Sequence, residues 1–101
     1  MFADGKAHGS DGVVLHWAAN GSDANRYAVA AKTTTGNAVV RNRIRRWARE
    51  LLRQWQQSIR PGHDMVLIAR GRDAARSFDD FAYHLRRVLA KAQLLAENQM
   101  T

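Results

Sequence analysis

The hydrophobic positions in the first third of the chain fall in two short runs bounded by turn residues. Residues 12–19 (GVVLHWAA) and 26–31 (RYAVAA) each have the length and composition of a strand. The segment between them begins with Asn-Gly-Ser-Asp, which favours a turn. We therefore predict an antiparallel hairpin with a loop of about six residues. Residues 6–8 are predicted to form a short edge strand.

The hydrophobic spacing becomes helical in the middle of the chain. Asn37 can cap a helix because its side chain can accept a hydrogen bond from a free amide of the first turn. We expect this helix to run to about Ser58 and to stop before Pro61-Gly62. The next apolar run, residues 65–69 (MVLIA), lies between chain-breaking residues and is predicted to be a buried central strand.

A second helix is predicted near the end of the chain. Ser77 can cap it, and Asp79 and Asp80 follow in the first turn, where acidic residues are favourable. Apolar residues then recur at helical spacing. The element order β-β-α-β-α predicts one α+β domain over residues 1–101, with helices on one face of a mixed sheet.

The first predicted strand has two faces of different character. Val13, Leu15 and Trp17 share one face because successive side chains of a strand point to opposite sides. Val14 and His16 lie on the other. We expect one face to carry the core, and the other could stack single-stranded bases.

The central helix is amphipathic. Its predicted core arc comprises Val40, Ile44, Trp47, Ala48, Leu51, Trp55 and Ile59. Its opposite arc comprises Asn42, Arg45, Arg46, Arg49 and Arg53, with Arg41 and Arg43 at the two edges. The helix therefore divides into an apolar side and an arginine-rich side.

The charge of the chain is concentrated on that helix. The net charge is +7, and residues 41–60 hold seven arginines against one acid, Glu50. Like charges at i, i+4 spacing, such as Arg41/Arg45 and Arg45/Arg49, repel each other by a few tenths of a kcal/mol. A solvated face usually mixes the signs of its charges. This pattern therefore predicts that the helix docks onto a polyanion, with nucleic acid as the first choice.

Composition excludes several other classes of function. The chain has no cysteine, so a disulfide framework, a thiolate zinc site and a cysteine nucleophile are excluded. It has no apolar run near the ~20 residues of a membrane helix, and residues 1–5 lack the features of a signal peptide. His8, His63 and His84 show no ligand spacing with one another. We predict a cytoplasmic protein with no catalytic residue and no metal site of its own.

The segment from Gly36 to Arg46 (GNAVVRNRIRR), followed by Arg49-Glu50, closely resembles the bacterial ribonuclease P protein component. The Arg-Asn-Arg core with a basic pair two residues later is the signature of that family. Residues 65–70 (MVLIAR) and the last helix also match, and Phe2 and residues 13–17 match more loosely. The resemblance covers residues 2–95.

This resemblance implies a protein cofactor of a catalytic RNA that removes the 5′ leader of precursor tRNA, using magnesium ions bound mainly by the RNA. The implied contacts with the catalytic RNA are Arg41, Asn42, Arg43, Arg45, Arg46, Arg49 and Lys32. His16 and Val14 are the implied contacts with the single-stranded leader. The family fold further implies a left-handed crossover through the central helix, whereas the general rule for such connections is right-handed.

The chain departs from the family pattern in two places. The family usually has two lysines after the second strand, but here Lys32 is followed by three threonines, residues 33–35. The family also begins with a basic, aromatic helix that forms one wall of the leader cleft, and this sequence starts where that helix would end. We therefore expect the RNA-docking face to be present and the leader site to be incomplete.

Two other functions are compatible with a basic helix. The first is another basic nucleic-acid-binding module, for duplex DNA or structured RNA, without a catalytic role. A module for duplex DNA would place the arginines in a major groove, although no helix-turn-helix pattern is present. A protein of the membrane surface would place the apolar arc against lipid, but that arc is needed to cover the sheet.

Overall fold

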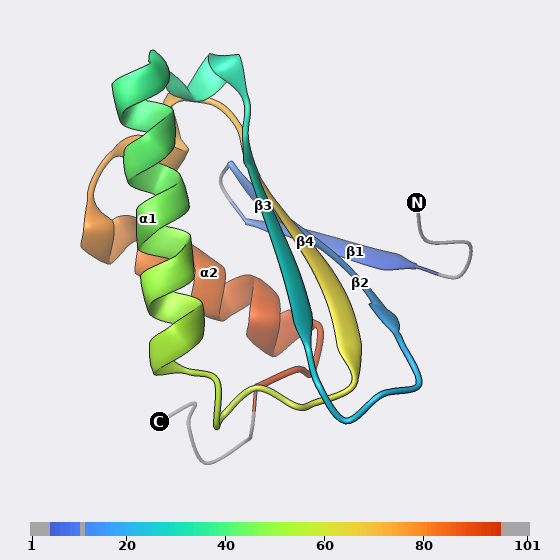
Figure 1. Cartoon of the computed structure of the whole chain (residues 1–101). Helices are drawn as coiled ribbons and strands as arrows, with labels where there is room; N and C mark the ends of the chain where they lie inside the picture. Colours follow the sequence, from blue (N-terminus) through green and yellow to red (C-terminus); the bar gives the residue numbers. More distant parts are fainter. Residues whose placement is uncertain (1–4, 11, 96–101) are drawn as a thin grey trace.

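A computed structural model describes residues 5–10 and 12–95 (Figure 1). Phe2, one of the looser matches of the resemblance, lies outside the described residues. The elements in chain order are β1 (Lys6–Ser10), β2 (Val13–Ala19), β3 (Arg26–Ala31), α1 (Ala38–Gln54), β4 (His63–Ala69) and α2 (Phe78–Lys91). Short 3-10 turns at Thr33–Thr35 and Arg72–Ala75 precede the two helices. The mixed α+β architecture and the edge strand agree with the sequence prediction.

The four strands form one sheet in the order β1-β2-β4-β3. β4 pairs antiparallel with β2 and parallel with β3, so it occupies the centre of the sheet as predicted. The predicted hairpin is wrong, because β4 lies between β2 and β3.

Two asparagines of the loop between β2 and β3 explain how this loop crosses the beginning of β4. The side-chain amide of Asn20 donates to Asp64 at 3.0 Å, and the side-chain oxygen of Asn25 accepts from the backbone N–H of His63 at 2.9 Å. These residues therefore bind the start of β4, where a tight hairpin turn would have left no room for it.

The connection β3-α1-β4 is a left-handed crossover, as the family resemblance implied. In Figure 1 the chain rises along β3, descends through α1 on the helix side and rises again along β4, which lies behind β3. α1 consequently packs over the β3 side of the sheet.

The start of α1 was predicted correctly and its end was not. The side chain of Asn37 accepts from the backbone N–H of Val40 at 3.0 Å and caps the helix. The helix ends at Gln54 rather than near Ser58. The chain leaves the helical path there because Ile59 is buried and forms a bridge with Leu95.

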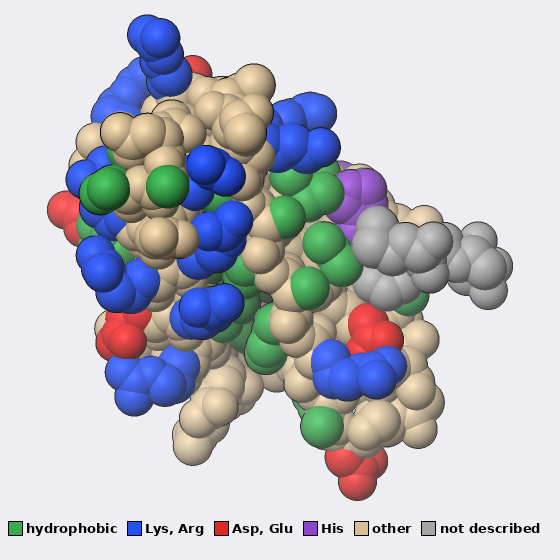
Figure 2. All heavy atoms as spheres, turned by 45° about the horizontal axis from the view of Figure 1, so that its top comes forward, with side chains coloured by type: hydrophobic (Ala, Val, Ile, Leu, Met, Phe, Trp, Pro, Cys, Tyr) green, Lys and Arg blue, Asp and Glu red, His purple; other side chains and the backbone are tan. Residues whose placement is uncertain are grey.

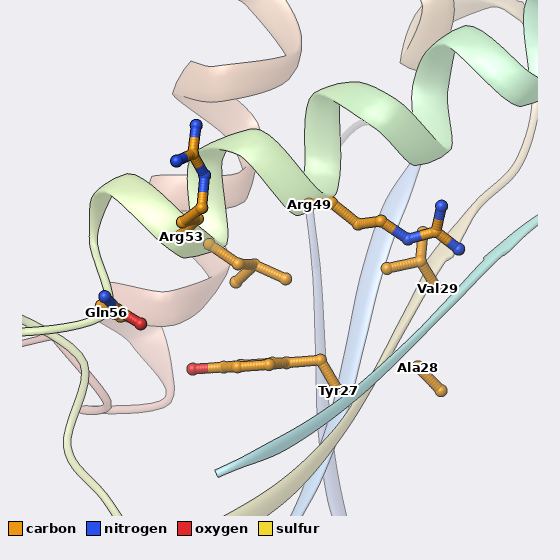
Figure 3. Close-up of a pocket in the computed structure, with 7 residues that line it drawn as sticks. Tyr27, Ala28, Val29, Arg49, Arg53 and Gln56 are labelled. Carbon is orange, nitrogen blue, oxygen red and sulfur yellow. The ribbon is translucent and has the colours of Figure 1, made fainter.

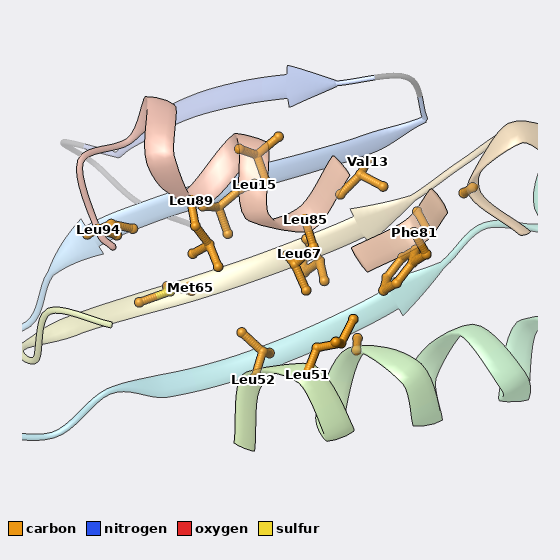
Figure 4. Packing of buried hydrophobic residues seen from close by; sticks show 14 of the residues in the cluster. Val13, Leu15, Leu51, Leu52, Met65, Leu67, Phe81, Leu85, Leu89 and Leu94 are labelled. Carbon is orange, nitrogen blue, oxygen red and sulfur yellow. The ribbon is translucent and has the colours of Figure 1, made fainter. Parts of the chain in front are cut away.

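Both helices cover the same face of the sheet, and the core lies between these two layers (Figure 4). Val13, Leu15 and Trp17 point into this core from β2, as the alternation predicted. α2, capped by Ser77, contributes the fully buried Leu85. The other buried core residues of the two helices are Ile44, Ala48, Leu51, Leu52, Phe81, Val88 and Leu89. Trp47 and Trp55, predicted as core, are partly buried at its margin.

Candidate nucleic-acid interface

The six predicted RNA-contact residues of α1 occupy the part of the helix that is turned away from the core. Asn42, Arg46 and Arg49 are exposed. Arg41 and Arg43, at the edges of the apolar arc, are half-buried, and so is Arg45, which the wheel placed on the opposite arc. Part of each of these three side chains therefore lies against the protein.

These arginines have no carboxylate partner among the described residues, which distinguishes them from several other arginines of the chain. Arg26, Arg53 and Arg76 form ion pairs with Asp64, Glu50 and Asp73, at 2.6 to 2.8 Å. Figure 2 shows Lys and Arg side chains gathered over the helix side of the molecule, beside a hollow that separates them from the strands. The positive charge of this face is therefore available to an external anion.

Two neighbouring contacts orient part of the arginine face. The guanidinium carbon of Arg43 lies 5.2 Å from the centre of the Trp47 ring, a cation–π contact. Arg45 donates to the side-chain oxygen of Asn42 at 2.9 Å. The Nε atoms of Arg41 and Arg43 are buried and have no hydrogen-bond partner among the described residues. Packing along the stems thus restricts these side chains before any ligand binds, which lowers the entropy lost on binding.

Lys32 is exposed and directly follows β3, close to the N-terminal end of α1. Its backbone N–H donates to Ala69, and Arg70 is the next residue after β4. Because β3 and β4 are parallel, the two cations leave the sheet at the same edge. Arg70 was not predicted as a site residue, and only the parallel pairing reveals that it accompanies Lys32.

His16 and Val14 lie half-buried on the sheet face opposite the helices. Val14 faces Ile68 of β4 and His16 faces Val66, so the two predicted residues belong to one shallow apolar surface. Among the described residues, no helix packs on this surface. Of the four residues that face one another here, only His16 carries an aromatic ring of the kind that stacks on bases.

An ion pair lies at one end of this open sheet face. Asp64 accepts two hydrogen bonds from Arg26, at 2.7 and 2.6 Å, and a third from Asn20. The hydrogen bond from Arg26, followed by that from Asn20, holds the pKa of Asp64 below its usual value. The same pair raises the pKa of Arg26. Asp64 is thus neutralised locally and adds little repulsion towards an anion on this face.

A second surface was not predicted from the sequence. A groove of about 320 Å³ lies between α1 and β3, and its lining includes Tyr27, Arg49 and Gln56. Tyr27 shares its strand face with Val29 and Ala31, which the alternation would have assigned to the core. Tyr27 is exposed because β3 is an edge strand that α1 covers only in part.

The described residues contain no group of three His, Cys, Asp or Glu side chains that could hold a metal ion. No helix in the described part of the chain is long and apolar enough to cross a membrane.

Comparison with known proteins identifies the family of this chain and of its fold. The family model described as Ribonuclease P matches residues 1–93. A ribonuclease P protein component from Syntrophomonas wolfei is 32% identical over 98 residues, covering 97% of this chain and 82% of that protein. One from Clostridium botulinum is 30% identical over 93 residues, covering 91% and 84% of the respective chains.

Solved structures agree with these sequence relatives. The RNase P protein of Staphylococcus aureus superimposes with a TM-score of 0.81 at 27% identity, covering 90% of this chain and 84% of that one. The RNase P protein of Thermotoga maritima, solved in complex with 1-(4-fluorophenyl)-2-thiourea, gives a TM-score of 0.77 at 28% identity. It covers 85% of this chain and 84% of its own.

Proposed function

Because this chain belongs to the ribonuclease P protein family, a component of an RNA-based tRNA-processing enzyme, we propose how the work is divided between its protein and its RNA. The catalytic RNA cleaves precursor tRNA and releases the 5′ leader in the cytoplasm. The protein binds that RNA through α1 and holds the leader on its sheet, and no side chain attacks the phosphodiester. The duplex-DNA alternative is not favoured, because the family and its solved structures are ribonuclease P proteins.

The observation that supports this proposal best is the state of the arginines on α1. They project from a helix whose other side is anchored in the core, and no carboxylate of the described residues pairs with Arg41, Arg43, Arg45, Arg46 or Arg49. Guanidinium groups form bidentate hydrogen bonds with phosphate oxygens and release condensed counterions when they do so. A row of guanidinium groups without carboxylate partners, carried by an anchored helix, is therefore suited to a folded RNA with closely spaced phosphates.

The second part of the proposal assigns the leader to the open sheet face. A single strand exposes the faces of its bases, and these can pack on the apolar surface around Val14, His16 and Ile68. Lys32 lies at the edge of the same sheet and can pair with a leader phosphate. Binding on two faces of one small protein would bring the leader and the catalytic RNA together, so that catalysis gains from positioning.

Magnesium enters this proposal as an ion bound mainly by the RNA. We assign no step to an ion held by the protein. The basic helix would act alongside it by reducing the phosphate repulsion that otherwise opposes assembly of the RNA with its substrate.

The test is reconstitution with a bacterial ribonuclease P RNA at low magnesium concentration, measuring cleavage of a precursor tRNA that carries a 5′ leader. We expect the RNA with this protein to cleave faster than the RNA alone, and the protein alone to cleave nothing. A variant with Arg45, Arg46 and Arg49 replaced by Gln should lose the stimulation. Cleavage by the protein without RNA, or full stimulation by that variant, would contradict the proposal.

A further inference from the structure

The groove between α1 and β3 combines an aromatic ring, cationic groups and a free strand edge. Figure 3 shows the Tyr27 ring reaching from β3 below the helix towards Gln56, while Arg49 and Arg53 project from the helix. The lining residues are Tyr27, Ala28, Val29, Arg49, Leu52, Arg53 and Gln56. This groove lies on the helix side of the sheet, so it is separate from the surface around His16.

The Tyr27 ring is held in place although 38% of the residue is exposed. Its hydroxyl oxygen accepts from the side-chain amide of Asn25 at 3.2 Å. That amide also donates to the carbonyl of Arg60 at 3.1 Å, and the side-chain oxygen of Asn25 accepts from the backbone of His63. Tyr27 is therefore oriented by a chain of hydrogen bonds, and a ligand that stacks on it loses little entropy in ordering the ring.

The charge of the groove favours an anion. Arg49 is exposed and has no carboxylate partner among the described residues. Arg53 donates to both oxygens of Glu50, at 2.9 and 2.8 Å, which lowers the pKa of that carboxyl group. Arg53 and Glu50 thus nearly neutralise each other, and Arg49 supplies the unbalanced positive charge.

The strand edge and Gln56 supply hydrogen-bonding groups. Among the described residues β3 pairs only with β4, so its outer backbone N–H and C=O groups have no strand partner. The amide of Gln56 offers both a donor and an acceptor. A planar ligand with mixed donors and acceptors along its edge fits this lining better than a purely apolar one does.

We propose that this groove binds one unpaired RNA nucleotide, with its base stacked on Tyr27 and its phosphate paired with Arg49. The inference rests on the proposed function, in which RNA is the partner of α1. A volume of about 320 Å³ holds a single base with its sugar and excludes a duplex. A simple anion would leave the exposed ring of Tyr27 unused, and an apolar molecule would leave Arg49 unpaired.

The remaining arginines of α1 support the continuity of this site with the docking face. Arg41 and Arg45 precede Arg49 at intervals of four residues, so the three lie along one side of the helix, about 6 Å apart. An RNA strand whose phosphates follow this row of arginines would reach the groove at Arg49, where one of its bases could enter.

The experiment measures binding of the full chain to fluorescent hexaadenylate and to an abasic hexamer of the same charge, by fluorescence anisotropy. Tyr27→Leu keeps apolar volume and removes the stacking surface. We expect it to weaken hexaadenylate binding roughly five- to a hundredfold while leaving the abasic hexamer unaffected. Tyr27→Phe should retain most of the affinity. Arg49→Gln should weaken binding of both hexamers and lower the salt slope by about 0.7.

Tyr83→Leu is the matched control, because Tyr83 is also an exposed tyrosine but lies on α2. It should leave both affinities unchanged. An unchanged preference for hexaadenylate over the abasic hexamer in Tyr27→Leu would overturn the inference. The inference would also be overturned if the only defect of Tyr27→Leu were a loss of self-association. In that case the groove would bind a second copy of the chain.

A measurement on the unaltered protein covers the case in which a variant does not fold. A hexamer containing 4-thiouridine should cross-link to the peptide that contains Tyr27, as mapped by mass spectrometry. Cross-links confined to the peptide containing His16 would place the single strand on the open sheet face alone and refute the groove site. In either case, stimulation of precursor tRNA cleavage tests the proposed function independently.

Discussion

Replacing Arg46 with Gln isolates the electrostatic contribution of the docking face. Arg46 is exposed on α1 and has no carboxylate partner among the described residues, so its removal disturbs no internal ion pair. Arg76→Gln is the matched control, since Arg76 is also exposed but pairs with Asp73 at 2.8 Å. Both variants lower the net charge by the same amount, but Arg46→Gln removes an unpaired charge from α1, whereas Arg76→Gln removes a charge that is paired with Asp73 and lies outside α1.

The expected magnitude follows from counterion release. One lost phosphate contact lowers the slope of log K against log salt concentration by about 0.7 to 0.9. Raising the salt concentration from about 50 to 200 mM weakens RNA binding by both the unaltered protein and the variant. The loss of affinity should be about threefold smaller for a variant that lacks one phosphate contact. Replacing Arg45 together with Arg46 should lower the slope by about 1.4 to 1.8. The free energy of unfolding should change by no more than about 0.5 kcal/mol for Arg46→Gln, because a surface side chain is altered.

The assay is filter binding or anisotropy with a bacterial ribonuclease P RNA at several salt concentrations. We expect Arg46→Gln to flatten the salt dependence and Arg76→Gln to leave it nearly unchanged. An equal flattening in both variants would show that only net charge matters, and an unchanged slope in Arg46→Gln would show that this side chain meets no phosphate. Either result would refute the assignment of α1 as a specific docking face.

Three further predictions concern the framework that presents these sites. Asn37→Ala should lower the free energy of unfolding by about 1 kcal/mol in urea titrations, because the hydrogen bond to Val40 caps α1. Leu85→Ala should cost about 2 to 5 kcal/mol in the same assay, since Leu85 is fully buried between α2 and the sheet. The lowered pKa of Asp64 means that its pair with Arg26 stabilises the fold above the ordinary aspartate pKa near 4. That contribution is lost as the pH falls through the lowered pKa of Asp64 in the folded protein. The difference in free energy of unfolding between the unaltered protein and Asp64→Asn should therefore be larger at pH 7 than at pH 3. An equal difference at both pH values would contradict this prediction.

Local features of the fold were predictable because their causes are local. Asn37 and Ser77 cap the two helices through hydrogen bonds to residues three positions later. The alternation in β2 correctly separated Val13, Leu15 and Trp17 from Val14 and His16. In each case a few adjacent residues contain both the pattern and the groups that satisfy it.

The strand order could not be predicted in this way, because it depends on contacts between distant segments. Residues 20–25 resemble a hairpin loop, yet Asn20 and Asn25 bind the beginning of β4, about forty positions later. The end of α1 was missed for a similar reason. Ile59 continues the helical spacing of apolar positions, but its burial is achieved beside Leu95, away from the helix axis.

The candidate site was predicted as far as it lies on one helix. The wheel placed the arginines on the side of α1 that faces away from the core, and the structure agrees. It could not show that Arg43 lies over Trp47, or that Lys32 and Arg70 leave the sheet together. Tyr27 was missed because strand alternation predicts only the face of the sheet on which a side chain lies. It does not predict whether a helix covers the side chain there.

The amphipathic pattern of α1 explains why the docking face is rigid as well as positively charged. Ile44 and Ala48 are fully buried against the sheet, so the helix cannot turn without exposing them to water. The backbone positions of the arginines on the remaining arcs are consequently set by the core. Their mutual repulsion then costs only a few tenths of a kcal/mol per pair, which burial of two or three side chains readily offsets. A polyanion that docks on α1 as we propose would meet charges carried at positions that the core defines, and the packing of the core would then contribute directly to recognition of RNA.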